Sequence, residues 1–261
     1  MDDLAGWLAL REAVDHASRS ASLVEEAAAA LPASRPLRVV DLGSGTGSNV
    51  RYLAPRLPAP QRWLLVDREP ALLARMNRSD LVLETRTADL GRFDAGLVAG
   101  AHLVTASALL DLVSEPWLRA LARACRDQNA VALFALTYNG RSSCSPPEPE
   151  DDRVLYLFNS HQRQNDKGFG TAAGPDAVER ASEAFEACSY QVRRHPSDWN
   201  LPPAAAALQT QLIDGWAEAA AEVAPEDGGM LADWRTRRIA HVRAGVSRIV
   251  VCHEDLVAIA V

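Results

Sequence analysis

The chain has 261 residues, of which 48% are hydrophobic and 23% are charged, and its formal net charge is −7. This length and composition allow one domain with a sizeable buried core. A negative net charge disfavours nucleic acids and anionic membranes as partners, because proteins bind both through fields of Lys and Arg. No stretch approaches the ~20 apolar residues of a membrane span, so we expect no membrane partner.

The cysteines and the first residues favour the reducing cytoplasm. Cys125, Cys144, Cys188 and Cys252 include no C-x-x-C pair, so neither a disulfide framework nor a metal site is expected. The chain starts with Met1-Asp2-Asp3 and lacks the basic residues that begin a secretory signal peptide. We therefore predict a cytoplasmic protein.

Strand and helix patterns alternate through the first half of the chain. Apolar residues recur at steps of three and four over residues 3–31, which predicts one continuous amphipathic helix. Repeated strand–helix units after it predict a parallel sheet with helices on both faces and right-handed crossovers. The predicted strands are 37–40, 63–66, a third beginning at 81, 102–106 and 130–136, with helices at 48–53, 70–78 and 117–126.

The pattern changes after the fifth strand. Residues 139–173 are polar and rich in Ser, Pro and Gly, which predicts an irregular loop insertion. Apolar spacing predicts helices at 176–188, 204–223 and 229–243, with a strand at 190–194. The last two helices would form a helical insertion at 203–245, on which the basic cluster Arg235, Arg237 and Arg238 would be a solvated face. The chain ends in a strand pattern that His253-Glu254-Asp255 interrupts.

The segment Val39-Val40-Asp41-Leu42-Gly43-Ser44-Gly45-Thr46-Gly47 carries the strongest functional signal. Glycines let the backbone turn sharply and approach a ligand, and the helix that follows offers free N–H groups. A dinucleotide site prefers G-x-G-x-x-G, but Ser48 stands at the sixth position here. Asp41 would repel a pyrophosphate and attract the ammonium group of S-adenosylmethionine (SAM).

Two further acids end the next two strands. Asp67 lies 20 residues after Gly47, at a spacing typical of an acid that accepts hydrogen bonds from ribose hydroxyls. Asp89 follows the third strand in Thr87-Ala88-Asp89-Leu90. Parallel strands bring such residues to one edge of the sheet, where open α/β sheets bind ligands. Taken singly, either acid could instead cap a helix.

This set of residues resembles the SAM-binding motifs of class I methyltransferases over residues 37 to about 138. The resemblance implies an α/β fold: a doubly wound, seven-stranded, mostly parallel sheet with an antiparallel edge strand, an N-terminal helix and a helical cap insertion. Residues 1–36 would form an N-terminal helical segment over the cofactor site, and 37–261 the methyltransferase domain. In that family the acid at Asp89 lies near the adenine amino group.

The resemblance also implies a set of cofactor-binding residues at the strand ends. Ser107 follows the fourth strand, where the family's backbone passes the sulfonium, although Ser107 could instead cap the next helix. Arg19, or Arg11, could reach the cofactor carboxylate from the N-terminal helix, since Arg pairs bidentately with carboxylates. The predicted cofactor-binding residues are Asp41, Gly43, Ser44, Gly45, Gly47, Asn49, Asp67, Arg68, Ala88, Asp89, Leu90, Ser107 and Arg19.

Two residues are candidates for catalysis. His161 lies in the polar segment 158–170 and could serve as a general base, because histidine is the side chain that most often exchanges protons near neutral pH. Asp111 follows the fourth strand and is the second candidate. The alternatives are a polar surface loop for His161 and an exposed first-turn acid for Asp111. Trp199 could line the site or belong to the core.

The predicted function is methyl transfer from SAM to an O, N or C atom of a small-molecule metabolite, with S-adenosylhomocysteine (SAH) as product. Three alternatives stay open: a SAM-binding regulator without turnover, an NAD-dependent Rossmann oxidoreductase, and aminopropyl transfer from decarboxylated SAM. A fold resemblance does not carry substrate identity. The sequence names neither the acceptor nor the oligomeric state, and a homodimer is possible.

Overall fold

The computed structural model describes residues 2–32, 36–76, 78–164 and 168–261. Eight strands within these residues form one sheet: β1 (Leu37–Leu42), β2 (Gln61–Asp67), β3 (Val82–Thr87), β4 (Leu103–Ser107), β5 (Val131–Ser145), β6 (Tyr190–Pro196), β7 (Trp199–Leu201) and β8 (Arg248–Ala260). The order across the sheet is β3-β2-β1-β4-β5-β8-β6, and β7 also pairs with β8. Strands β1 to β5 are parallel, whereas β8 is antiparallel to its neighbours.

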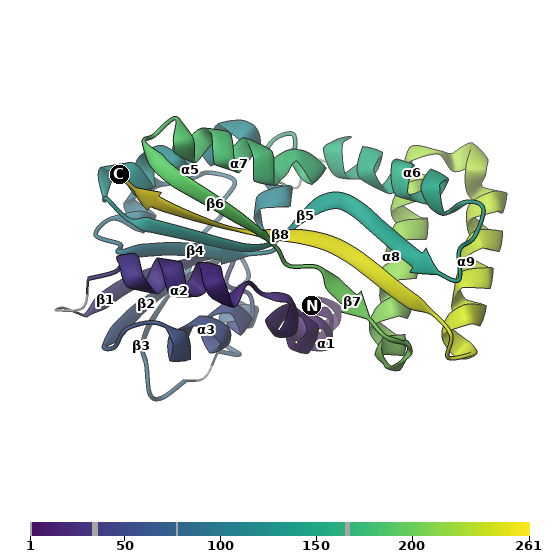
Figure 1. Cartoon of the computed structure of the whole chain (residues 1–261), viewed down its shortest axis with the longest axis horizontal. Coiled ribbons are helices and arrows are strands. Elements are labelled where there is room, and N and C mark those ends of the chain that lie inside the picture. Colours follow the sequence, from purple (N-terminus) through teal and green to yellow (C-terminus); the bar gives the residue numbers. More distant parts are fainter. Residues whose placement is uncertain (1, 33–35, 77, 165–167) are drawn as a thin grey trace.

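Helices cover both faces of this sheet (Figure 1). On one face, α5 and α7 bury apolar side chains against β1, β4 and β5. On the other face, α2 packs against β5 and β8, and α3 belongs to the same apolar cluster together with β1 and β2. The helices are α1 (Asp2–Ser18), α2 (Ala21–Ala30), α3 (Ser48–Leu53), α4 (Pro70–Leu73), α5 (Glu115–Asp127), α6 (Asp151–Gln164), α7 (Ala177–Glu186), α8 (Ala206–Val223) and α9 (Gly228–Arg243). None of the described helices is long and apolar enough to cross a membrane.

The predicted doubly wound, mostly parallel α/β sheet is confirmed. The antiparallel strand is not at the edge as predicted, because β8 lies between β5 and the edge strand β6. The predicted count of seven strands is one too few. The additional strand is β7, which has only three residues and pairs with Val251, Val250 and Ile249 of β8. A three-residue strand is too short to show a period in the sequence.

The N-terminal segment is two helices rather than the one continuous helix predicted over 3–31. The break falls at Arg19 and Ser20. Ser20 caps α2 by accepting a hydrogen bond from the Leu23 backbone N–H at 3.4 Å. Its own N–H donates to Asp255 on β8 at 2.9 Å. The break therefore fixes the chain to the sheet and turns Arg19 into the interior, where it is 7% exposed.

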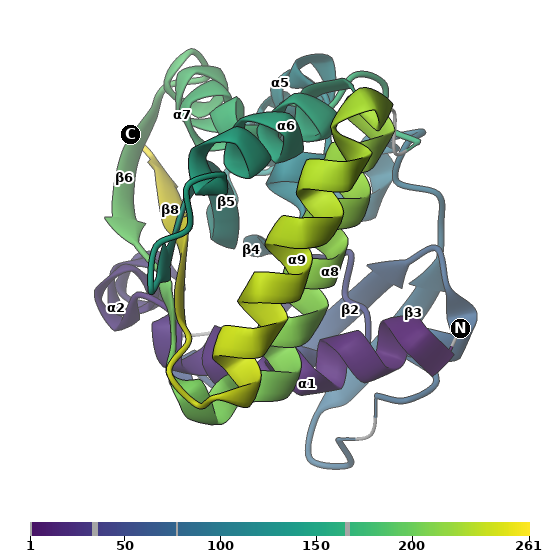
Figure 2. The same ribbon diagram turned by 90° about the vertical axis from the view of Figure 1, so that its right-hand side faces the viewer.

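Strands β5 and β8 continue side by side beyond the carboxyl edge of the other parallel strands. Helices α6, α8 and α9 pack against this extension (Figure 2). The irregular loop predicted at 139–173 is wrong over much of its length, because β5 runs to Ser145 and α6 spans Asp151–Gln164. Residues 165–167 of that segment lie outside the described residues. Helices α8 and α9 fall within the predicted helical insertion. We call α6, α8, α9 and the strand ends beside them the cap.

Strand β8 is continuous, so the predicted interruption at residues 253–255 is also wrong. His253 and Asp255 point inward and are 7% and 1% exposed. The expected solvated face of α9 needs a similar correction. Arg238 is fully buried and pairs with Asp151 at the start of α6. Buried charges of this kind need a partner, which the linear pattern does not reveal.

Candidate functional site

The glycine turn between β1 and α3 lies at the carboxyl edge of the parallel strands. Gly43, Gly45 and Gly47 have φ of +68°, +52° and +83°, a region that only glycine adopts readily. The turn is fixed to β2, because the N–H groups of Gly43 and Ser44 donate to the Val66 carbonyl at 2.8 and 3.0 Å. A Cβ at Gly45 would lie 3.1 Å from Leu8 Cδ1 of α1. The predicted turn residues thus shape one tight backbone loop beneath α1.

Asp41, at the end of β1, is a buried carboxylate that is only half satisfied. Its side chain is almost fully enclosed, and Oδ1 accepts a hydrogen bond from Asn49 Nδ2 at 2.6 Å. Oδ2 has no hydrogen-bond partner among the described residues. Burial raises the pKa of Asp41 to about 7, against the opposing effects of Asn49, Ser44 and Arg19. A cation beside Oδ2 would therefore be bound strongly.

Arg19 lies on the other side of Asn49 and is also incompletely paired. Its Nη1 donates to Asn49 Oδ1 at 2.8 Å, and its guanidinium lies 4.5 Å from the centre of the Tyr52 ring. Nε is 3.6 Å from Asp255 Oδ2, which gives an ion pair but no hydrogen bond. Nη2 likewise has no hydrogen-bond partner within the described chain. Asn49 thus bridges a carboxylate and a guanidinium that each keep unused hydrogen-bonding capacity.

This arrangement fits the amino-acid end of a bound cofactor. An ammonium group would satisfy Asp41 Oδ2, and a carboxylate would satisfy Arg19 Nη2. Buried polar atoms without a hydrogen-bond partner are costly and uncommon. Two such atoms, one on Asp41 and one on Arg19, lie on either side of the Asn49 side chain, which favours a ligand that carries both a positive and a negative charge.

Asp67 and Arg68 follow β2 beside the glycine turn. Asp67 Oδ2 accepts from the Gly45 N–H at 2.8 Å, and Oδ1 accepts from the Glu69 N–H at 3.0 Å. The carboxylate thus ties the turn to the end of β2. Arg68 is exposed, with Nε 3.7 Å from Glu69. Contacts of Asp67 and Arg68 with a ribose stay a prediction.

Ala88, Asp89 and Leu90 follow β3 at the same edge. The Ala88 N–H donates to the Asp67 carbonyl at 3.0 Å, which joins the two strand ends. Asp89 is exposed and accepts from the Gly91 N–H at 3.0 Å. Leu90 is buried, and its carbonyl accepts from the Trp117 indole at 2.7 Å. The structure thus places all three strand ends together, with the Asp89 carboxylate facing outward.

Ser107 and Asp111 lie where β4 ends. Ser107 is the last residue of the strand and caps neither the 3-10 turn Leu110–Leu112 nor α5, which overturns its alternative as a helix cap. Between them, Ala108 has φ +52° and donates its N–H to the Ala135 carbonyl at 2.9 Å. Asp111 lies half-buried on the 3-10 turn rather than on the surface. Its role as a base stays a prediction.

A cavity of about 650 Å³, which we call the outer cavity, lies among α1, α6 and α8. His161 on α6 lines it, with Nε2 2.9 Å from the exposed Glu222 carboxylate of α8. Trp7 of α1 also lines it, whereas the next residue, Leu8, approaches Gly45. Helix α1 therefore contacts both the outer cavity and the glycine turn, which places the cavity near the predicted cofactor site.

Sequence reasoning missed two residues that shape this region. Trp216 of α8 lines the outer cavity, and its exposed fraction is 7%. Asp255 holds Arg19 and the break between α1 and α2. The signal for Asp255 was present, since acids rarely stand in the middle of an apolar strand without a partner. Arg11 instead pairs with Asp15 at 2.8 Å.

The chain shares its α/β fold with solved structures of low sequence identity. The YcgJ protein from Bacillus subtilis is similar at a TM-score of 0.50 and 14% identity, over 93% of this chain and all of that chain. No protein-family model matches the sequence, and no curated protein matches it significantly.

Two further solved structures are similar over most of this chain. The cyclopropane synthase MmaA2 from Mycobacterium tuberculosis is 11% identical, with a TM-score of 0.48 over 91% of this chain and 83% of that chain. A geranyl diphosphate methyltransferase in complex with SAM is 13% identical, with a TM-score of 0.45 over 92% and 85%.

Proposed function

We propose that this protein is a SAM-dependent methyltransferase that acts on a small-molecule acceptor. The observation that carries the proposal is the pair of incompletely satisfied charges, Asp41 and Arg19, bridged by Asn49 at the glycine turn. SAM ends in an ammonium and a carboxylate, which match these two charges. Decarboxylated SAM and a dinucleotide pyrophosphate lack one or both of these groups, so both are weaker fits.

When bound, SAM supplies a methyl group that its sulfonium makes electrophilic. The chain's own residues orient the reactants: Asp41, Arg19 and the glycine turn hold the cofactor, and α1 covers it. Trp7, Phe158 and Trp216 line the outer cavity and would exclude water from the acceptor. The volume of about 650 Å³ falls within the range of small-molecule sites.

Isothermal titration with four ligands tests the cofactor. We expect SAM and SAH to bind with dissociation constants on the order of 10 μM, and decarboxylated SAM to bind at least about tenfold more weakly, because Arg19 would lose its carboxylate partner. NAD⁺ serves as the control and should give no heat. Preferential binding of NAD⁺ would support the oxidoreductase instead. If SAM binds but no acceptor of a broad panel leads to SAH release in a turnover assay, the result would support a regulator.

We propose His161 as the general base for acceptors that lose a proton. Glu222 would hold the imidazole through Nε2, and Nδ1 would take the proton. With such an acceptor, His161→Gln should lower kcat about 100-fold and leave SAH affinity unchanged. Asp111→Asn is the comparison. A larger loss of kcat in that variant, with His161→Gln near wild type, would assign the base to Asp111.

A further inference from the structure

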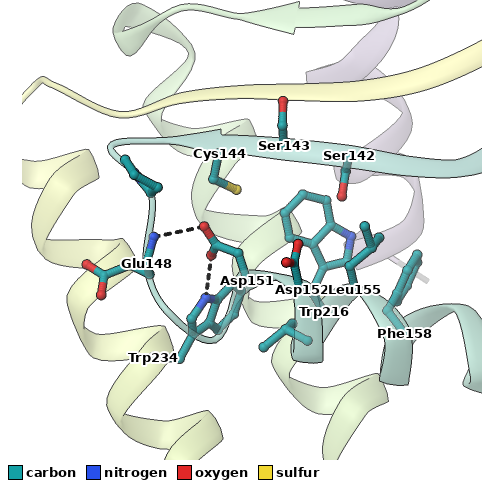
Figure 3. A pocket seen from close by; sticks show the side chains of 12 residues that line it. Ser142, Ser143, Cys144, Glu148, Asp151, Asp152, Leu155, Phe158, Trp216 and Trp234 are labelled. Atoms are coloured by element: carbon teal, nitrogen blue, oxygen red, sulfur yellow. Dashed lines mark hydrogen bonds between the residues drawn. The ribbon is translucent and has the colours of Figure 1, made fainter.

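A second cavity lies deeper in the cap, between β5, α6 and the helices α8 and α9 (Figure 3). We call it the inner cavity, and its volume is about 280 Å³. Ser142 and Cys144 point into it from β5, whereas Ser143 points away. Asp151 and Asp152 enter from the first turn of α6, and Trp216 and Trp234 from α8 and α9.

Acidic side chains line the inner cavity, and no Lys, Arg or His lines it. Two of the acids are already neutralised from outside the cavity. Asp151 pairs with the buried Arg238, and Glu148 accepts hydrogen bonds from Arg237 and His241 at 2.6 and 2.7 Å. Asp152 differs from them, because it is exposed and no cation pairs with it within the described chain. The cavity therefore has one uncompensated negative charge on its lining, which disfavours a phosphate or a carboxylate.

Three aromatic side chains, Phe158, Trp216 and Trp234, form part of the remaining lining. The Phe158 and Trp216 rings are 6.2 Å apart at an interplanar angle of 60°, and Trp234 is held by its indole N–H, which donates to Asp151 at 2.8 Å. Aromatic faces attract cations through the ring quadrupole, and an adjacent carboxylate adds a direct charge interaction. Acid and aromatic walls together favour an organic cation over a neutral or anionic group.

The two cavities share a wall, since Phe158 and Trp216 line both. These two rings contact each other, with 6.2 Å between their centroids, so a ligand in the inner cavity would pack against one side of this wall. We propose that the inner cavity binds a protonated amine, with Asp152 as its counter-ion. This site is additional to the proposed methyl-acceptor site, and binding alone tests it.

Calorimetric titration with three ligands of similar shape tests the site. Phenethylamine is cationic at pH 7.5, 2-phenylethanol is neutral and phenylacetate is anionic. We expect the amine to bind at least about tenfold more tightly than the alcohol, and the carboxylate to give no measurable binding. The variant Asp152→Asn should remove the preference for the amine and leave alcohol binding unchanged. Asp233→Asn, on the exposed side of α9, is the matched control and should keep the preference.

Three results would overturn the proposal: no measurable binding of the amine, equal binding of amine and alcohol, or equal effects of the two substitutions. Because an acid in the first turn also stabilises a helix, the unfolding temperature of Asp152→Asn is measured alongside. SAH titration of the same samples separates the two hypotheses. Normal SAH binding without amine preference would refute the inner site alone, whereas amine preference without SAH binding would refute the proposed function alone.

Discussion

Replacing Asp41 with Asn is expected to weaken SAH binding about 100-fold. The substitution removes the negative charge that faces the cofactor ammonium, and a charge-assisted hydrogen bond in a buried site contributes about 1.5–3 kcal/mol. Asn has the same shape as Asp, so position 41 keeps its contact with Asn49, which is 2.6 Å long in the wild-type protein, and loses only its negative charge. Calorimetry at pH 7.5 measures the loss. Affinity within threefold of wild type would contradict the assignment of Asp41 to the ammonium.

The same substitution should change how stability depends on pH. Burial raises the pKa of Asp41 from 3.8 to about 7, so the folded state holds the proton more tightly than the unfolded state does. The bound proton therefore stabilises the folded state in full below pH 3.8, and this contribution is lost as the pH rises to about 7. The contribution to the free energy of unfolding is on the order of 4 kcal/mol. Urea denaturation from pH 4.5 to 8 should show Asp41→Asn gaining stability relative to wild type as the pH rises.

Ligand affinity gives an independent check of this pKa. An α-amino group titrates near pH 8, so the cofactor ammonium stays charged between pH 7 and 5.5. Over that range the wild-type protein must ionise a progressively more protonated Asp41 to bind SAH, and affinity should fall about tenfold. The Asp41→Asn variant should bind weakly and equally at both pH values. A parallel fall in the variant would assign the effect to another group.

The central fold and the glycine turn could be predicted because their determinants are local. A strand, an acid and alternating glycines follow one another within residues 39–47. Each of these glycines adopts a positive φ, a conformation that a glycine in the sequence makes it possible to predict. The acids Asp67 and Asp89 stand at strand ends, where parallel topology brings them to one edge regardless of the rest of the chain. The parallel direction of the first five strands follows from the same alternation of elements.

The cap was not predictable in the same way, because distant pairings create it. Residues 139–145 are mostly polar, yet they continue β5, because residues 142–145 pair with residues 248–251 of β8. Arg238 appears as one of several arginines on a helix, and only its partner Asp151, 87 positions away, explains its complete burial. The cavity walls are similar: Phe158 and Trp216 meet through helix packing. Such contacts have no local signature.

Asp255 is an acid within an apolar strand pattern, and its hydrogen bonds join segments that lie far apart in the sequence. Replacing it with Ala is expected to lower the free energy of unfolding by about 3–5 kcal/mol. Its Oδ2 accepts from the Ser20 N–H at 2.9 Å and its Oδ1 from the Leu136 N–H at 2.8 Å, so it joins the helix break to the irregular point of β5. It is also the acid nearest the buried Arg19 guanidinium, at 3.6 Å. Alanine leaves two buried donors and one buried charge without compensation.

A double-mutant cycle with Arg19→Met separates these contributions, measured by urea denaturation at pH 7.5. Removing the guanidinium should recover about 1–3 kcal/mol of the loss caused by Asp255→Ala, because the uncompensated charge disappears. The rest should persist, since the N–H groups of Ser20 and Leu136 stay unpaired. Glu226→Ala, on the surface of the cap, should change stability by less than about 0.5 kcal/mol. Strict additivity would mean that Asp255 acts on the backbone alone, and Arg19 would then owe its orientation to Asn49 and Tyr52.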